Sequence, residues 1–291
     1  MKYKRTFWVL GGDMRQAHLA QLLAADGHRV FTYALEHGAH AAPDTMAARS
    51  LHALPEACCV ILPLPVCGEG GALSAPLSDE AHPLCDILVH LSPEQVICGG
   101  RLDAGTQDLF ARRRLTVHDY FAREELVVAN AIPTAEGAVQ IAMEELPVTI
   151  HGLQVLVIGC GRVGKLTAHR FSALGAHVSV AARRYEQLAW ASALGFSTLL
   201  TQQLKDDSGR YGLIVNTVPA TILDRDALAG IREDSLIIDL ASKPGGVDMD
   251  AAAQLGRRVI WALSLPGKVA PVTAGSYIRD TVYNILRESG K

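Results

Sequence analysis

The sequence predicts an α/β protein with two doubly wound parallel sheets joined by a bridging helix, and three observations lead to this prediction. The chain has 291 residues, enough for two domains of roughly 150 residues each. Hydrophobic residues make up 49% of it and aromatic residues only 5%, a balance that favours helices packed on buried parallel strands over a β-sandwich. A strand–helix–strand pattern also occurs twice, once in each half of the chain.

The two copies of this pattern cover residues 7–34 and 153–182. Each opens with an apolar strand-like run, passes through a glycine turn into an amphipathic helix, and ends with a second strand after a glycine that suits a left-handed helix cap. The turn glycine and the closing glycine are 16 residues apart in both copies, from Gly11 to Gly27 and from Gly159 to Gly175. Two such units predict two Rossmann-like domains.

Short apolar runs between turn residues predict the other strands. These runs are residues 59–63, 87–91, 95–98 and 115–118 in the first half, and 213–217, 236–239 and 259–262 in the second half. Helical segments such as 224–232 fall between them, and the Pro- and Gly-rich stretch 63–79 is typical of a loop. Alternating strands and helices are expected to form parallel sheets.

The domain boundary is expected near residue 130. Residues 1–129 would form an N-terminal domain for a substrate or partner, and residues 130–291 a cofactor domain. A bridging helix is predicted over 130–146, with Pro133 in its first turn, where proline is tolerated. The last amphipathic helix, 273–289, belongs to the second domain by position, and packing back on the first domain is an open alternative.

Composition excludes several classes of protein. The net charge is −3, from 27 basic and 30 acidic residues, so charge gives no support for nucleic-acid binding. The apolar run at residues 7–10 is too short for a signal peptide, and no membrane span is predicted. The six cysteines form no C-x-x-C pair, and no His cluster completes a metal site. We therefore expect a cytoplasmic protein with reduced thiols and no metal.

A G-x-G-x-x-G motif follows the first strand of the second copy, in the segment Gly159-Cys160-Gly161-Arg162-Val163-Gly164. Gly159 would allow the tight turn, Gly161 would let the backbone approach a pyrophosphate, and Gly164 would let the helix pack on the strand. The pyrophosphate would lie on the helix N-terminus, where free N–H groups favour an anion. Because the motif lies between a strand and a helix, it predicts a dinucleotide site.

The end of the next strand, Ala182-Arg183-Arg184, indicates which dinucleotide binds. No acid is present in residues 176–185 to bond a ribose hydroxyl. Two arginines there suit a 2′-phosphate, so we expect NADP(H), although both arginines would also be ordinary on a solvated surface. The cofactor crevice is also expected to include the loops that follow the next strands, Asn216-Thr217-Val218-Pro219 and, from the 241–246 loop, Ala241 and Ser242.

The first copy has lost the nucleotide motif. Asp13 replaces the second glycine and Gln16 the third, and the turn now carries Arg15. A side chain at the second position would obstruct a pyrophosphate. We interpret this turn as a loop that faces the substrate, with a structural turn and a surface arginine as the alternative.

Several motifs together identify a family. They are GGDMRQ, NAIPTAEGAVQIAMEE, VIGCGRVG, NTVPA, DLASKPGGVD and LPGKVAPVTAG. Over nearly its full length the chain resembles the A subunits of dipicolinate synthase from spore-forming bacteria. The resemblance implies an oxidoreductase that converts a dihydro- or tetrahydrodipicolinate-type cyclic imine into dipicolinate. It also implies a second, flavoprotein-like partner, the B subunit of the synthase, and a location in the cytoplasm of the mother cell of a sporulating bacterium.

Such a reaction needs donors for two carboxylates and a base for one proton. Arg15 is the first choice for a carboxylate, with Thr134 and residues 273–276 as further anion donors at expected helix starts. Lys243 would approach the reacting ring. His90 and His118 are candidates for the base, with an ordinary histidine or a water base as the alternative. We also expect a homo-oligomer.

Two other functions stay open from the residues themselves. One is another NADP-dependent two-domain dehydrogenase for a hydroxy or amino acid, and the second domain does resemble the nucleotide domains of such enzymes. The only histidines after the glycine motif are His169 and His177, inside the strand–helix–strand unit, which disfavours a hydroxyacid mechanism. The other is a non-catalytic protein that binds NADP(H) and regulates a partner.

Overall fold

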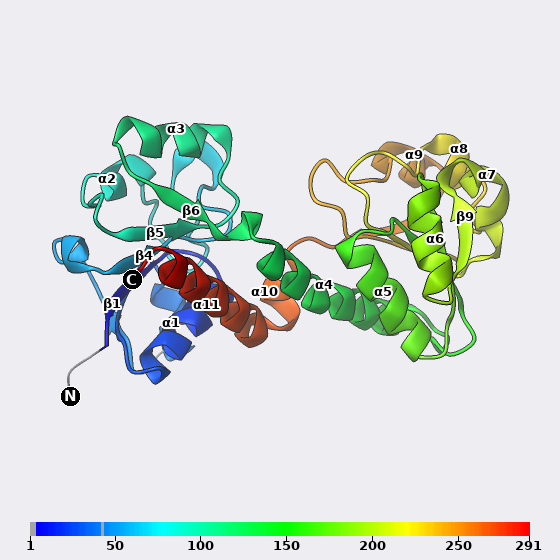
Figure 1. The fold of residues 1–291 in the computed structure, drawn as a ribbon. Coiled ribbons are helices and arrows are strands. Elements are labelled where there is room, and N and C mark those ends of the chain that lie inside the picture. Colours follow the sequence, from blue (N-terminus) through cyan, green and yellow to red (C-terminus); the bar gives the residue numbers. More distant parts are fainter. Residues whose placement is uncertain (1–3, 42–43) are drawn as a thin grey trace. The chain divides into compact units, whose positions relative to one another are not determined.

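The computed structural model describes residues 4–41 and 44–291, which divide into two compact units (Figure 1). The first unit comprises the chain up to Asn130 together with Ala270–Lys291, and the second comprises Ala131–Val269. Each unit contains a six-stranded sheet in which every strand pairing is parallel. This architecture confirms the predicted α/β class with two doubly wound sheets.

The first sheet has the strand order β3-β2-β1-β4-β5-β6. Its strands are β1 (Thr6–Leu10), β2 (Arg29–Tyr33), β3 (Met46–Ala47), β4 (Cys59–Ile61), β5 (Val96–Gly99) and β6 (Val117–Asp119). The helices of this unit are α1 (Met14–Ala25), α2 (Leu84–Leu88), α3 (Ala104–Arg112), the start of α4 (Glu124–Glu145) and α11 (Pro271–Glu288).

The second sheet has the equivalent order β12-β11-β10-β7-β8-β9. Its strands are β7 (Gln154–Ile158), β8 (His177–Ala182), β9 (Ser197–Leu200), β10 (Leu213–Asn216), β11 (Leu236–Asp239) and β12 (Arg258–Trp261). Its helices are the remainder of α4, α5 (Arg162–Ala173), α6 (Tyr185–Ala193), α7 (Leu204–Asp207), α8 (Arg225–Ala229), α9 (Met249–Gln254) and α10 (Leu265–Val269).

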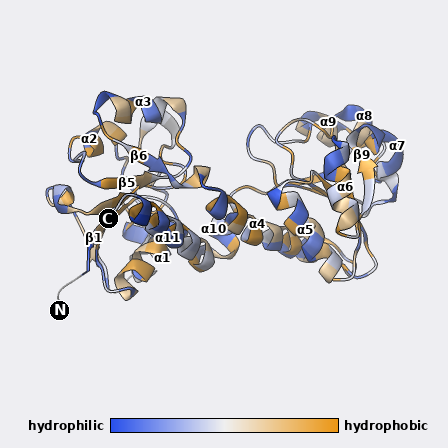
Figure 2. Cartoon of the chain, in the orientation of Figure 1, coloured by the Kyte–Doolittle hydropathy of each residue, from blue (hydrophilic) through white to orange (hydrophobic). Residues whose placement is uncertain are grey.

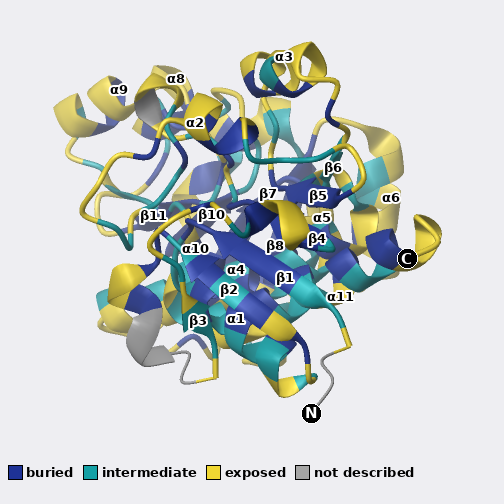
Figure 3. Cartoon of the chain, turned by 90° about the vertical axis from the view of Figure 1, so that its left-hand side faces the viewer, coloured by how far each residue is buried: buried dark blue, intermediate teal, exposed yellow. Residues whose placement is uncertain are grey.

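Each face of each sheet is covered by an apolar core, because neighbouring side chains of the central strands point to opposite faces. In β1, Phe7 and Val9 join the core under α1 and α11, whereas Trp8 joins the core on the opposite face. Successive side chains of a strand point to opposite faces, so a fully apolar strand such as β1 is buried on both sides. Figure 3 shows β1, β4 and β5 as buried, with exposed residues on the outer sides of α3, α8 and α9.

One predicted strand is wrong. The sequence predicts a strand over residues 87–91, but the chain forms helix α2 over Leu84–Leu88. Leu84, Ile87 and Leu88 are all buried, and their i, i+3, i+4 spacing is the period of a helix face. A short apolar run does not distinguish the two structures by itself. The edge strands β3 and β9 are additions that the sequence pattern does not predict.

The bridging helix begins earlier than predicted. α4 starts at Glu124, so Pro133 lies in its interior and not in its first turn. A proline there removes one backbone hydrogen bond, and the long helix continues on either side of it. By length and composition α4 has the properties of a membrane span, with a mean hydropathy of 1.3, and it is mostly orange or pale in Figure 2. However, Leu126 is buried in the first unit's core and Ala138 and Ala142 in the second's, as in a core helix.

The C-terminal helix α11 lies beside α1 in the first unit (Figure 1). Ile278, Val282 and Ile285 of α11 share a core with Leu19 and Leu23 of α1. The two helices approach closely at Gly275, where a Cβ would lie 2.7 Å from the backbone oxygen of Arg15 and 3.1 Å from the nitrogen of Leu19. Both neighbours are backbone atoms, so only glycine fits without separating the helices.

We expect Gly275→Ala to lower the free energy of unfolding by about 1–3 kcal/mol, because the added methyl forces the two backbones apart. Urea unfolding followed by circular dichroism measures this. Gly105→Ala in α3 is the matched control, since a Cβ there meets only the Asp103 Oδ1 atom, at 3.5 Å, and alanine favours a helix by up to about 1 kcal/mol. An unchanged Gly275→Ala variant would contradict the proposed close approach.

Candidate functional site

The glycine-rich turn of the second unit connects β7 to α5 through a very close backbone approach. Gly159 has a φ of +103°, a conformation that side chains disfavour. A Cβ on Gly164 would lie 2.1 Å from the carbonyl oxygen of Gly159, and a Cβ on Gly159 would lie 2.3 Å from the Oγ1 atom of Thr217. These two positions therefore require glycine for packing within the protein.

Gly161 differs from them, since a Cβ there would meet nothing within 4 Å. It is the N-cap residue of α5, and no side chain caps the helix at this point. The first turn of a helix presents N–H groups without partners inside the helix, and Arg162, with Val163 beside it, begins that turn. Space for an anion and backbone donors for it thus occur together.

The end of β8 presents the two arginines that suggested a phosphate. Ala182 is buried as the last residue of the strand, while Arg183 and Arg184 are exposed. Arg184 forms an ion pair with Glu186 at 3.0 Å, with both side chains more than half exposed. An exposed pair of this kind contributes little to stability, so Arg184 remains available to an incoming phosphate.

The loops after β10 and β11 lie at the same carboxyl edge as the glycine turn. Asn216 is fully buried, Thr217 and Val218 are half-buried, and Pro219 is exposed. The Thr217 hydroxyl donates to the carbonyl of Ile158 at 2.9 Å, which ties the β10 loop to the end of β7. In the β11 loop, Ala241 is buried while Ser242 and Lys243 are exposed.

The corresponding turn in the first unit is closed by the protein's own chain. The amide of Gly12 donates to the carbonyl of Ser74 at 2.7 Å. A Cβ on Gly11 would lie 2.6 Å from Leu73 and 2.9 Å from the Ser74 oxygen. Residues 73–74 therefore pack directly on this turn, so it does not offer the open space found at Gly161.

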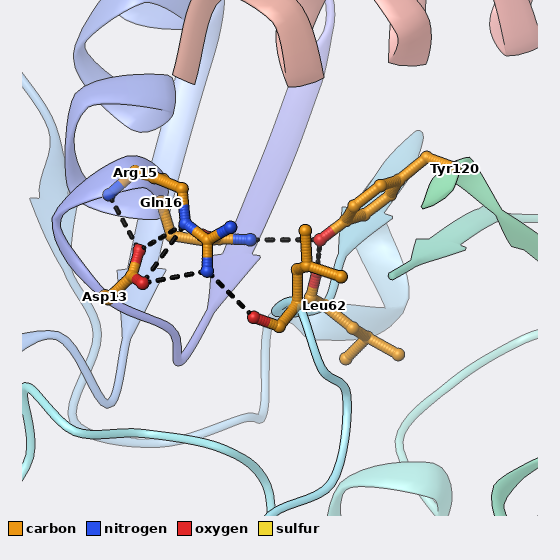
Figure 4. Close-up of polar contacts among 6 residues, drawn as sticks. Asp13, Arg15, Gln16, Leu62 and Tyr120 are labelled. Carbon is orange, nitrogen blue, oxygen red and sulfur yellow. Dashed lines mark hydrogen bonds and ion pairs between the residues drawn. The ribbon is translucent and has the colours of Figure 1, made fainter. Parts of the chain in front are cut away.

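Arg15 is held in a network at the N-terminus of α1 (Figure 4). Its Nε and Nη2 atoms donate to the Asp13 carboxylate at 2.8–3.1 Å, and Nη2 also donates to the carbonyl of Leu64 at 3.0 Å. The Arg15 side chain is only 8% exposed. Asp13 also caps the helix through the Arg15 amide, so one carboxylate both starts the helix and orients the guanidinium.

A second chain of hydrogen bonds lies beside this pair. Gln16 donates from Nε2 to the Tyr120 hydroxyl at 3.1 Å, and that hydroxyl donates to the carbonyl of Leu62 at 2.9 Å. All of Tyr120 is buried, and burial raises its pKa, so it stays protonated and remains a donor. The Oε1 atom of Gln16 is buried without a partner among the described residues. The end of β4 is thereby fixed against α1.

The structure does not bring every candidate residue to these edges. His90 follows α2 and precedes β5, which places it at the amino edge of the first sheet, opposite Arg15. Its ring lies 6.4 Å from that of His52. His118 is half-buried within β6. Thr134 lies inside α4 and not at a helix start, so the expected free backbone donors are absent there, because the helix begins at Glu124.

The sequence analysis did not identify two residues near the carboxyl edge of the second sheet. Asp239 ends the fully buried strand β11 and is itself only 1% exposed, and an acid at the end of an apolar run was the available signal. Glu186 lies one residue beyond the acid-free segment 176–185, and only the folded chain brings its carboxylate to Arg184.

The residues of the second unit fit a dinucleotide. Gly161 forms a cradle that a side chain would fill, α5 provides an uncapped N-terminus, and the arginines lie at the end of the second strand, where the ribose of a dinucleotide is read.

Comparisons with known proteins assign both units. Residues 6–121 match the family model of the N-terminal domain of the dipicolinate synthase A subunit. Residues 131–254 match that of the NAD-binding domain of D-isomer specific 2-hydroxyacid dehydrogenases. The second unit is therefore a nicotinamide-dinucleotide-binding domain of the Rossmann type.

The chain has relatives that match it over nearly their whole length. It is 33% identical to the dipicolinate synthase A subunit of Bacillus subtilis strain 168 over 286 residues, which are 96% of this chain and 95% of that protein. The crystal structure of the Bacillus halodurans A subunit matches 98% of this chain and 99% of its own, with 28% identity and a TM-score of 0.88. That of the Bacillus subtilis protein matches 99% and 97%, with 31% identity and a TM-score of 0.87. The chain belongs to the family of dipicolinate synthase A subunits.

Proposed function

We propose that this protein oxidises a cyclic dihydro- or tetrahydrodipicolinate-type imine to dipicolinate with NADP(H) as the cofactor. The observation that carries the proposal is the open, uncapped glycine turn at Gly161 in a chain of this family. The names of the relatives, which are dipicolinate synthases, support the substrate class.

The chemistry divides between the cofactor and the chain. The bound cofactor would supply a hydride acceptor, so that a dihydro substrate loses one hydride and one proton as the pyridine ring forms, and a 4-hydroxy-tetrahydro substrate also loses water. The N–H groups at the start of α5 would hold the pyrophosphate, and Arg183 and Arg184 would hold the 2′-phosphate. Lys243, exposed in the loop after β11, is proposed to approach the substrate ring.

Arg15 is proposed to bind one carboxylate of the substrate. Its pairing with Asp13 restricts the guanidinium to one orientation and uses Nε and Nη2, and Nη1 has no partner among the described residues. The Asp13 charge also reduces the attraction for a second anion. Arg15 therefore fits a role in orienting a carboxylate better than a role in attracting it from solution.

The direct test is turnover of the candidate imine with NADP⁺, followed through NADPH absorbance and pyridine formation. We propose that the protein acts as a homo-oligomer with a flavoprotein-like partner, the B subunit of the synthase, so the assay is run with and without that partner. Cofactor binding without turnover under either condition would favour a regulatory role instead.

We expect Gly161→Val to abolish most NADPH binding while the fold is retained. The isopropyl group would extend into open space that the pyrophosphate needs, and the new Cβ would meet no atom within 4 Å apart from its immediate chain neighbours. Calorimetric titration with NADPH gives the affinity, and thermal unfolding gives the stability. Gly164→Ala is the contrasting variant, because its Cβ would collide with the Gly159 oxygen and should disrupt the fold. If Gly161→Val binds NADPH as tightly as the unmodified protein does, the proposed site is wrong.

We expect the protein to prefer NADPH over NADH by about 10- to 150-fold, the range of a charge-assisted phosphate contact. Arg183→Ser should remove more of this preference than Arg184→Ser, because Arg184 is shared with Glu186. Calorimetry with both cofactors measures the ratio for each variant. Equal affinities of the unmodified protein for the two cofactors would rule out the arginine assignment.

We expect Arg15→Ala to lower kcat/KM for the imine, because a buried charge-assisted bond to a carboxylate is lost. The lost transition-state stabilisation should be roughly 2–4 kcal/mol. The affinity for NADPH should change little, because the cofactor residues belong to the second unit. Arg15→Lys is the partner variant, which keeps the charge without the two-pronged contact to Asp13. Weakened NADPH binding with normal turnover at saturation would contradict the assignment.

A further inference from the structure

The carboxylate of Asp239 lies at the centre of the cofactor edge in the second unit. Its Oδ1 atom accepts from the Nδ2 atom of Asn216 at 2.8 Å and from the amide of Ala241 at 3.0 Å. Its Oδ2 atom accepts from the amide of Gly246 at 2.8 Å. All three donors are neutral and the residue is 1% exposed, so the carboxylate is a buried charge that depends on these bonds.

These bonds hold both ends of the loop that follows β11. Ala241 begins this loop, Gly246 ends it, and Ser242 and Lys243 lie between them. A turn inside the loop is closed by the Gly245 amide, which donates to the Ser242 carbonyl at 2.9 Å. The Nε1 atom of Trp261 donates to the Ala241 carbonyl at 2.8 Å.

The same carboxylate reaches the loop after β10 through Asn216. The Nδ2 atom of Asn216 also donates to the Val218 carbonyl at 3.0 Å, and its Oδ1 atom accepts from the Val218 amide at 3.1 Å. Thr217, between them, lies against Gly159 of the glycine turn. A continuous series of contacts therefore runs from the glycine turn through Asn216 to Asp239 and the β11 loop.

The position of this series relates it to one half of a dinucleotide. In a sheet with this strand order, the protein contacts the ribose next to the adenine at the end of the second strand. That strand is β8 here, and it lies on one side of β7. β10 and β11 lie on the other side of β7, so the nicotinamide half would extend over their ends. We propose that Asp239 is a positioning residue that shapes the nicotinamide half of the site, an inference that rests on the proposed cofactor function.

The variant Asp239→Asn tests this with almost no change in size. An asparagine has one acceptor oxygen and places an NH₂ group where the other oxygen was. Because N–H donors face both oxygens, one end of the loop must lose its bond. We expect NADPH affinity to fall about ten-fold or more, while affinity for adenosine 2′,5′-bisphosphate, which represents the adenine half alone, stays within about two-fold.

Two controls separate positioning from loss of stability. Asp248→Ala removes a carboxylate that caps α9 through the Ala251 amide at 2.9 Å, just beyond the same loop. It should lower the thermal unfolding temperature without changing either affinity. Arg183→Ser should lower the affinity for NADPH and for adenosine 2′,5′-bisphosphate together. If Asp239→Asn does not fold, Asn216→Ala removes the side-chain donor to Asp239 together with the two bonds to Val218, and should give the same pattern.

Each outcome is decisive. Wild-type protein is first titrated with NADPH and NADH, and with adenosine 2′,5′-bisphosphate and ADP as the matched halves, so that the preferred pair is used throughout. If it binds neither cofactor, the proposed function fails at this step and the inference falls with it. If it binds a cofactor but the variant leaves both affinities unchanged, or weakens the whole cofactor and its adenine half equally, the role of Asp239 is overturned and the proposed function stands.

Discussion

Gly164 has no room for a side chain, and the arrangement of the carboxyl edge of the second sheet depends on this constraint. A Cβ would lie 2.1 Å from the Gly159 oxygen, well inside van der Waals contact. Because the atom is absent, α5 begins directly against the end of β7, and its first N–H groups point to the turn that a pyrophosphate would occupy. The loop after β10 closes on the same turn through Thr217, so the glycine turn and this loop both take their positions from one missing side chain.

The first unit has the same strand order but uses its turn differently. There, Asp13 caps α1 and pairs with Arg15, and residues 73–74 cover the glycines. A helix N-terminus that can attract an anion is thus satisfied internally by a carboxylate. The duplicated architecture leaves one turn open and the other closed, and the closed turn presents a buried, oriented arginine.

Strong local patterns were readable from the sequence. The glycine turn, its flanking strand and helix, and the strand β11 agree with the pattern-based prediction because their signals are short-range. The α2 error arises because a short apolar run satisfies strand and helix patterns alike. The predicted start of α4 is late because proline favours a first turn, although this helix tolerates Pro133 inside. Leu64, which accepts from Arg15, and Asn216, which donates to Asp239, come from distant segments of the chain, so no local pattern points to these contacts.

The first unit is assembled from two separate stretches of chain, and this has a consequence for its synthesis. During translation the second unit is complete by residue 269, whereas the first still lacks α11. Until that helix emerges from the ribosome, Leu19 and Leu23 of α1 have no cover from Ile278 and Val282. The later-encoded unit therefore can fold first, and the nascent N-terminal half exposes an apolar helix face to chaperones until α11 is made.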